Sequence, residues 1–70
     1  MLHTVTVFKI MSGNSVVDST STDQWLTEEV ALQQARKKRD AYNASEFVVS
    51  GKGEPARIVR AQRSRIIKHL

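Results

Sequence analysis

The side chains in this sequence that are best suited to bind a ligand are cations, and they concentrate in its second half. Residues 1–35 carry one cation and four carboxylates, a net charge of −3, whereas residues 36–70 carry ten cations and three carboxylates, a net charge of +7. Guanidinium groups bind phosphate and carboxylate oxygens through paired N–H donors. A chain polarised in this way is expected to present a basic face to a polyanion.

Nine of these cations fall in two clusters and form the candidate binding site. One cluster is a run of four near the end of a predicted helix, and the other follows a glycine-rich loop. The nine are Arg36, Lys37, Lys38, Arg39, Arg57, Arg60, Arg63, Arg65 and Lys68. Two interpretations of the run of four stay open. It is either a solvated last turn that suits the helix dipole or a contact surface for an anionic partner.

Residue types that support catalysis or metal binding occur without the necessary spacing. His3 and His69 stand at opposite ends of the chain, with no cluster of further ligand residues beside either. No serine is paired with a base in a pattern that favours nucleophilic catalysis, and the chain has no cysteine. The segment 51–53, Gly-Lys-Gly, lacks the spacing of a phosphate-binding P-loop. We therefore expect a protein that is not an enzyme and needs no metal or cofactor.

The clearest element that could position these cations is a helix over residues 27–42. Thr27 is a typical N-cap, and Leu26 before it could form half of a hydrophobic staple. Asn43 is suited to end the helix. Its predicted apolar side is formed by Ala31, Leu32, Ala35 and Tyr42, which recur at helical spacing.

Segments rich in β-branched and aromatic residues predict strands on both sides of this helix. The first is 3–11, and a turn joins it to a second, short strand over 15–19. The polar segment 18–23 has almost nothing to bury and is predicted to be a loop. A third strand is predicted over 45–50, with the sequence SEFVVS.

Residues 56–62 are ambiguous between a strand and a helix. The adjacent β-branched pair Ile58 and Val59 favours a strand, hairpinned to the third one. Pro55 suits the first position of a helix, which supports the alternative. We predict the strand, which leaves residues 63–70 as a basic tail or a short terminal helix.

These elements predict an α+β domain with the order β-β-α-β-β, one antiparallel sheet packing on the helix, and a single domain over residues 1–70. Trp25 is either a packing residue or an exposed platform for stacking a base. The predicted core consists of Val5, Val7, Phe8, Ile10, Val16, Leu26, Ala31, Leu32, Ala35, Tyr42, Phe47, Val49, Ile58 and Val59.

Composition limits the class further. A chain of 70 residues buries little core, and formation of a homodimer would add to it. The absence of cysteine fits a reducing cytoplasm. Residues 1–11 do not form the apolar segment of a secretory signal. No apolar run approaches the roughly 20 residues that span a bilayer. We expect a cytoplasmic protein that does not bind membranes.

The strand VTVFKI, the helix start LTEEVALQQA and the segment FVVSGKG together give a build that resembles small accessory proteins encoded by phages and prophages. Some anti-CRISPR and other host-takeover proteins share this short, basic, cysteine-free build. The resemblance implies a protein that acts by binding a host protein or a nucleic acid, and it carries over no site residues.

Two partner classes therefore remain. The first is DNA or RNA, bound mainly through phosphates by a face that joins the two cationic clusters. The second is an acidic surface on a host protein, which this chain would modulate or inhibit. Only four aromatic residues are present and most are needed for the core, which argues against recognition of single strands by base stacking.

Overall fold

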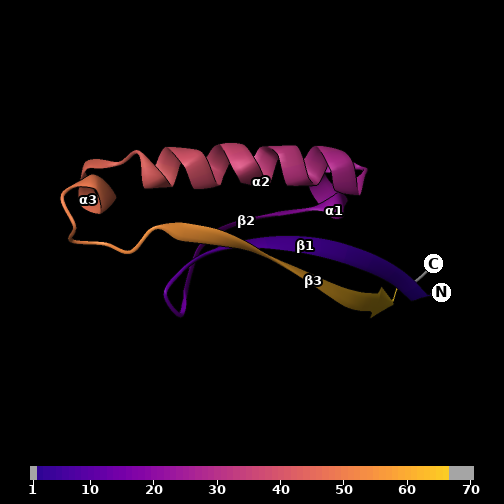
Figure 1. Cartoon of the computed structure of the whole chain (residues 1–70). Helices are drawn as coiled ribbons and strands as arrows, with labels where there is room; N and C mark the ends of the chain where they lie inside the picture. Colours follow the sequence, from indigo (N-terminus) through magenta and orange to yellow (C-terminus); the bar gives the residue numbers. More distant parts are fainter. Residues whose placement is uncertain (1, 67–70) are drawn as a thin grey trace.

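The computed structural model describes the backbone of residues 2–66 and the side chains of residues 4–64. A three-stranded antiparallel sheet of order β2-β1-β3 lies beneath one long helix, which covers one face of the sheet (Figure 1). The elements are β1 (Leu2–Ser12), β2 (Ser15–Ser21), α1 (Thr22–Trp25), α2 (Glu28–Asn43), α3 (Glu46–Val49) and β3 (Ala56–Ile66). This is the predicted α+β class, with three strands in place of four.

β1 is the central strand and organises the sheet. It forms a hairpin with β2 through a two-residue turn, in which Gly13 has a φ of 61° that suits glycine. β3 pairs with β1 along its whole length, from Leu2 opposite Ile66 to Ser12 opposite Ala56. The predicted hairpin between strands over 45–50 and 56–62 is therefore wrong, because the last strand returns to the first.

α2 begins and ends close to the predicted positions. The Thr27 hydroxyl accepts a hydrogen bond from the Val30 amide at 3.2 Å, which confirms the N-cap. At the other end, the Asn43 side chain binds both backbone groups of Ala56. Its Oδ1 accepts from the Ala56 amide at 2.6 Å, and its Nδ2 donates to the Ala56 carbonyl at 3.2 Å. Asn43 thereby fixes the start of β3 against the end of α2.

The core lies between α2 and the sheet and depends on small residues in the helix. Ala31 and Ala35 are fully buried, so the helix backbone comes close to Phe8 and Ile10 of β1. Thr20 of β2 donates its hydroxyl proton to the Ala31 carbonyl at 2.7 Å, which satisfies a buried polar group. Ala56 completes the buried cluster, and Trp25, Leu32, Tyr42 and Ile58 pack against it.

The predicted core is confirmed where β1 and α2 meet and wrong at its edges. Val7 and Val59 are half-buried, and by strand alternation they point to the face opposite Phe8, away from α2. Four further predicted core residues are exposed: Val16, Leu26, Phe47 and Val49. They lie at the ends of elements or in α3, where the single helix α2 provides no cover.

The segment predicted as a third strand is the short helix α3. Glycine explains the difference: Gly51, which follows the C-cap residue Ser50, adopts a φ of 82°. Its amide donates to the Val48 carbonyl, and the Lys52 amide donates to the Phe47 carbonyl. These two bonds form a Schellman motif, which ends helices. Phe47 and its valine neighbours suit strands by residue type, but these end signals outweigh that preference.

Two other segments differ from expectation. The polar segment 18–23 is not a loop, because β2 continues to Ser21 and α1 follows directly. Thr22 supports this arrangement, since its Oγ1 accepts a hydrogen bond from the Thr6 amide at 3.2 Å. At the other end, residues 63–66 continue β3 and are neither tail nor helix. Residues 67–70 lie outside the described part of the chain.

Leu26 occupies an unusual backbone conformation between α1 and α2. Its φ is 68° and its ψ is −41°, and the Thr27 amide bonds to the Trp25 carbonyl across it at 2.8 Å. This is a γ-turn of the positive-φ type, which is rare and strained. The Leu26 side chain is 88% exposed, so the predicted staple is wrong. Trp25 packs against the core, as expected of a packing residue and not of an exposed platform for stacking a base.

Candidate binding surfaces

Lys38, the third residue of the cationic run, is tied to the sheet. Its ammonium lies 3.1 Å from the Asp18 carboxylate of β2. The Ser19 amide also donates to that carboxylate at 2.8 Å. These two donors hold the pKa of Asp18 below its usual value, the Ser19 amide contributing most and partial burial opposing them. Lys38 therefore connects α2 to β2.

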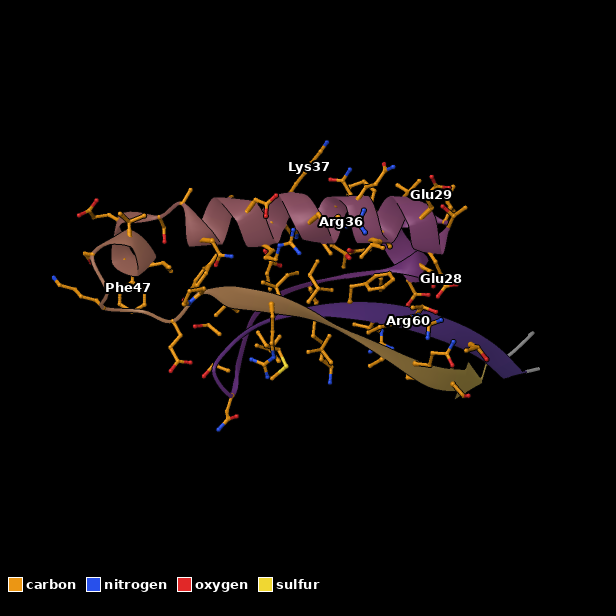
Figure 2. All side chains as sticks on the ribbon, viewed as in Figure 1. Glu28, Glu29, Arg36, Lys37, Phe47 and Arg60 are labelled. Carbon is orange, nitrogen blue, oxygen red and sulfur yellow. The ribbon has the colours of Figure 1, made fainter. Side chains whose placement is uncertain are left out.

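The rest of the run points in other directions. Arg39 pairs with its neighbour Asp40, with Nε and Oδ1 3.1 Å apart. Arg36 and Lys37 are exposed and form no ion pair with the residues that the structure describes. Lys37 extends away from the sheet on the outer side of α2 (Figure 2). The four cations thus surround the helix and do not form one stripe.

Arg60 joins β3 to the first turn of α2. It lies opposite Phe8, so it faces the helix, where Glu28 meets it (Figure 2). The Arg60 Nη2 and Nε donate to the same Glu28 oxygen at 2.5 and 3.2 Å. Arg60 above all, and then the Thr6 hydroxyl, lower the pKa of Glu28. This candidate binding residue therefore holds the helix to the sheet.

Arg63 forms a second connection, on the other face of the sheet. It lies opposite Val5, and its Nη2 is 3.6 Å from a carboxylate oxygen of Asp23 in α1. The pair therefore connects β3 to α1. Val5 is fully buried, although its side chain alternates to the face opposite Phe8 and α2.

The remaining candidates belong to β3 and the end of the chain. Arg57 donates from Nη1 to the Gly13 carbonyl in the hairpin turn at 3.1 Å. Arg65 lies in β3 opposite His3, but its side chain lies outside the described part. Lys68 is also outside it. The structure places α2 and the Arg57 side of β3 on opposite sides of the sheet, so it does not bring all the described members of the two clusters together.

The face of the sheet away from the helices, which we name the open face, has a distinct chemistry. Side chains alternate between the faces of a strand, so the observed register assigns its members. They are Val5, Val7, Lys9 and Met11 of β1, Val16, Ser19 and Ser21 of β2, and Arg57, Val59, Ala61 and Arg63 of β3. Within the described strands, no carboxylate belongs to it.

Lys9 occupies the middle of this open face on the central strand. Its cross-strand neighbours are Ser19 and Val59, and the half-buried Val7 and Met11 flank it along β1. Lys9 is exposed and forms no ion pair with any residue whose side chain is described. The result is an apolar patch with a cation at its centre and arginines towards its ends.

Sequence reasoning missed Lys9 and the apolar residues around it. It also treated Arg57, Arg60 and Arg63 as one cluster. Their spacing of three would place them on one side of a helix, but in a strand it sends the middle one to the opposite face. The strand prediction for 56–62 therefore already contained the signal that separates Arg60 from the other two.

Comparisons with protein-family models, with characterised proteins and with solved structures return no match. Among the described residues, no group of three or more His, Asp or Glu side chains is arranged to hold a metal ion. None of the helices in that part of the chain is long and apolar enough to cross a bilayer. Function must therefore be argued from the surfaces themselves.

Proposed function

We propose that this chain is a binding domain without catalytic activity, and that its open face docks on an acidic and partly apolar surface of a larger protein. The observation that carries this proposal is the position of Lys9, which has no ion-pair partner among the described side chains and lies at the centre of a half-buried apolar patch. By covering such a surface, the domain would modulate or inhibit its partner, as the resemblance to phage accessory proteins implies.

The apolar part of the open face favours a protein partner over a nucleic acid. Protein interfaces combine an apolar centre with a polar rim, and they are enriched in Met and Arg. Val7, Met11 and Val59 would gain contacts with apolar side chains but not with phosphate groups. None of the members of the open face is aromatic, so it offers no platform for stacking bases.

The ion pairs on the helix-covered side support the same choice. Arg60 and Lys38 are bonded to carboxylates that hold α2 against the sheet. The charge of each is therefore already partly balanced by a carboxylate of its own chain. Among the described side chains, Lys9 has no carboxylate partner, and Arg57 donates to a backbone carbonyl. These two cations of the open face are therefore available to an outside carboxylate.

A second candidate function is binding of DNA or RNA, and one observation favours it. Arg36 and Lys37 are exposed on α2 without a carboxylate partner in the described part of the chain. Two adjacent free cations can contact neighbouring phosphates. This surface lies on the other side of the molecule from the open face, so variants can test the two functions separately.

The test compares three labelled probes by fluorescence anisotropy at two salt concentrations. One is a peptide with an apolar stripe bordered by glutamates, another is polyglutamate of equal charge, and the third is a DNA duplex. We expect the amphipathic peptide to bind about tenfold more tightly than polyglutamate, because only it can use the apolar patch. Equal binding of the two, or tighter binding of the duplex, would contradict the proposal.

Matched double variants locate the site. Lys9→Gln/Arg57→Gln and Arg36→Gln/Lys37→Gln each remove two cations, the first from the open face and the second from α2. Only the first pair should weaken binding of the amphipathic peptide. A duplex whose affinity falls only with the second pair would instead support nucleic-acid binding through α2.

A further inference from the structure

Three features coincide where α1 meets α2. Leu26 has the only positive φ of any non-glycine residue among those described, and its apolar side chain is almost fully exposed. An open depression of about 510 Å³ lies directly beside it. The lining residues are Thr4, Thr6, Thr22, Asp23, Leu26 and Glu28. The adjacent Trp25 has a buried indole Nε1 without a hydrogen-bond partner in the described part of the chain.

Within its own chain, a leucine at this position does not stabilise the fold. Glycine adopts positive φ without strain, whereas a leucine there is strained. An exposed leucine also buries little of its own surface to offset that strain. A strained, exposed apolar residue at the rim of a depression is therefore best explained by a contact outside its own chain.

Among the described residues, the carboxylates that border this depression have cationic neighbours. Asp23 and Glu28 border the depression, but each carboxylate is close to an arginine of β3. The other lining residues besides Leu26 are threonines, which carry no charge. Two identical regions could therefore approach each other without the repulsion that a basic or acidic patch would cause.

We propose that Leu26 and this depression form the contact between two copies of the chain. A protrusion beside a hollow is self-complementary under a two-fold axis, because each copy can insert its protrusion into the hollow of the other. Leu26 of each protomer enters the depression of its partner, between the threonine side chains and the first turn of α2. The open face, by contrast, would bring Lys9 and the arginines of two copies together and is unsuited to this contact.

The contact stays small, so the dimer is weak, with a dissociation constant on the order of 100 µM, because stable interfaces bury about 1,600 Å². It leaves the open face free in both protomers. A dimer would then present two binding faces and gain avidity for a partner with repeated sites. The dimer itself does not depend on the proposed function.

Sedimentation equilibrium of the purified chain up to millimolar concentration tests this inference. Leu26→Asn removes the apolar protrusion, and asparagine tolerates positive φ better than leucine. Val49→Asn is the control, since Val49 is an exposed valine in α3, away from the depression. We expect Leu26→Asn to raise the dissociation constant at least about tenfold, and the control to leave it unchanged. A wild-type chain that stays monomeric, or a Leu26→Asn variant that dimerises normally, would overturn the proposal.

Disulfide trapping separately tests whether Leu26 of one copy lies in the depression of the other. Because the sequence contains no cysteine, only the introduced cysteines can form a crosslink. Leu26→Cys protein mixed with Thr4→Cys protein should yield a crosslinked heterodimer under mild oxidation, because Leu26 enters the depression that Thr4 lines. Val49→Cys mixed with Thr4→Cys should not. Equal crosslinking in both mixtures would show that the two copies meet elsewhere.

Discussion

The two faces of the sheet use the same residue types for different purposes. On the covered face, Phe8 and Ile10 meet the alanines of α2, and arginine and lysine bind carboxylates that connect helix to strand. On the open face, valines and Met11 are only half-buried, and Lys9 has no carboxylate among the described residues. The number of cations therefore does not indicate which of them can bind a partner, whereas the face on which each cation lies does.

The largest expected difference between the faces is in stability. Phe8→Ala should lower the free energy of unfolding by about 3–5 kcal/mol, since it leaves a cavity against Ala31 and Ala35. Val7→Ala, one residue along on the open face, should lower it by about 1 kcal/mol or less, because the valine is already partly exposed. Urea denaturation followed by circular dichroism measures both. Similar losses would show that something covers the open face in solution.

The junction between α2 and β3 should give the next largest effect. Asn43→Ala removes both bonds to Ala56 and leaves part-buried backbone groups unpaired, so we expect a loss of about 1–3 kcal/mol. Gln33→Ala, at an exposed position of α2, is the control and should change stability by less than about 0.5 kcal/mol. If Asn43→Ala were as mild as the control, the Asn43 bridge would not anchor β3.

Local signals made part of this fold predictable. Thr27 was identified as the N-cap from residue type alone, and Phe8, Ile10, Ala31 and Ala35 were identified as core from their spacing. These assignments depend on neighbours within a few residues. The strand over 56–62 was also correct, although its pairing was not.

Pairing between distant segments was the part that local patterns could not supply. β3 pairs with β1, and this pairing joins residues up to 64 positions apart. It places Arg60 opposite Phe8 and within hydrogen-bond distance of Glu28. Without that register, the arginines of β3 cannot be assigned to faces. The helix over 46–49 was missed for a different reason, because strand preferences of Phe47 and its neighbours hid the cap at Gly51.

A smaller effect separates two arginines on the two faces. Arg60→Gln should lower stability by about 0.2–1 kcal/mol, as is usual for exposed ion pairs. It should leave binding of the amphipathic peptide unchanged. Arg57→Gln should do the reverse and weaken peptide binding with little loss of stability. Loss of binding in both variants would contradict the proposal that the covered face stabilises the fold and the open face binds the partner.

Acid should weaken the covered face in particular. The pKa values of Asp18 and Glu28 are lowered in the folded chain, by the Ser19 amide and Lys38 in one case and by Arg60 and Thr6 in the other. A lowered pKa means that the folded state favours the ionised carboxylate. Its contribution is present above the unfolded values of about 4 and is lost as the pH falls through the lower folded values.

The double variant Asp18→Asn/Glu28→Gln removes this source of acid sensitivity from the covered face. Urea midpoints measured from pH 6 to pH 2 should therefore fall less steeply for the variant than for the wild-type chain. The difference should be small, since both carboxylates are exposed and their ion pairs are screened by water. Lys9→Gln is the matched control, because it removes a charge from the open face and should leave the acid slope unchanged. Parallel slopes for all three proteins would mean that the pairs beneath α2 do not hold the helix to the sheet.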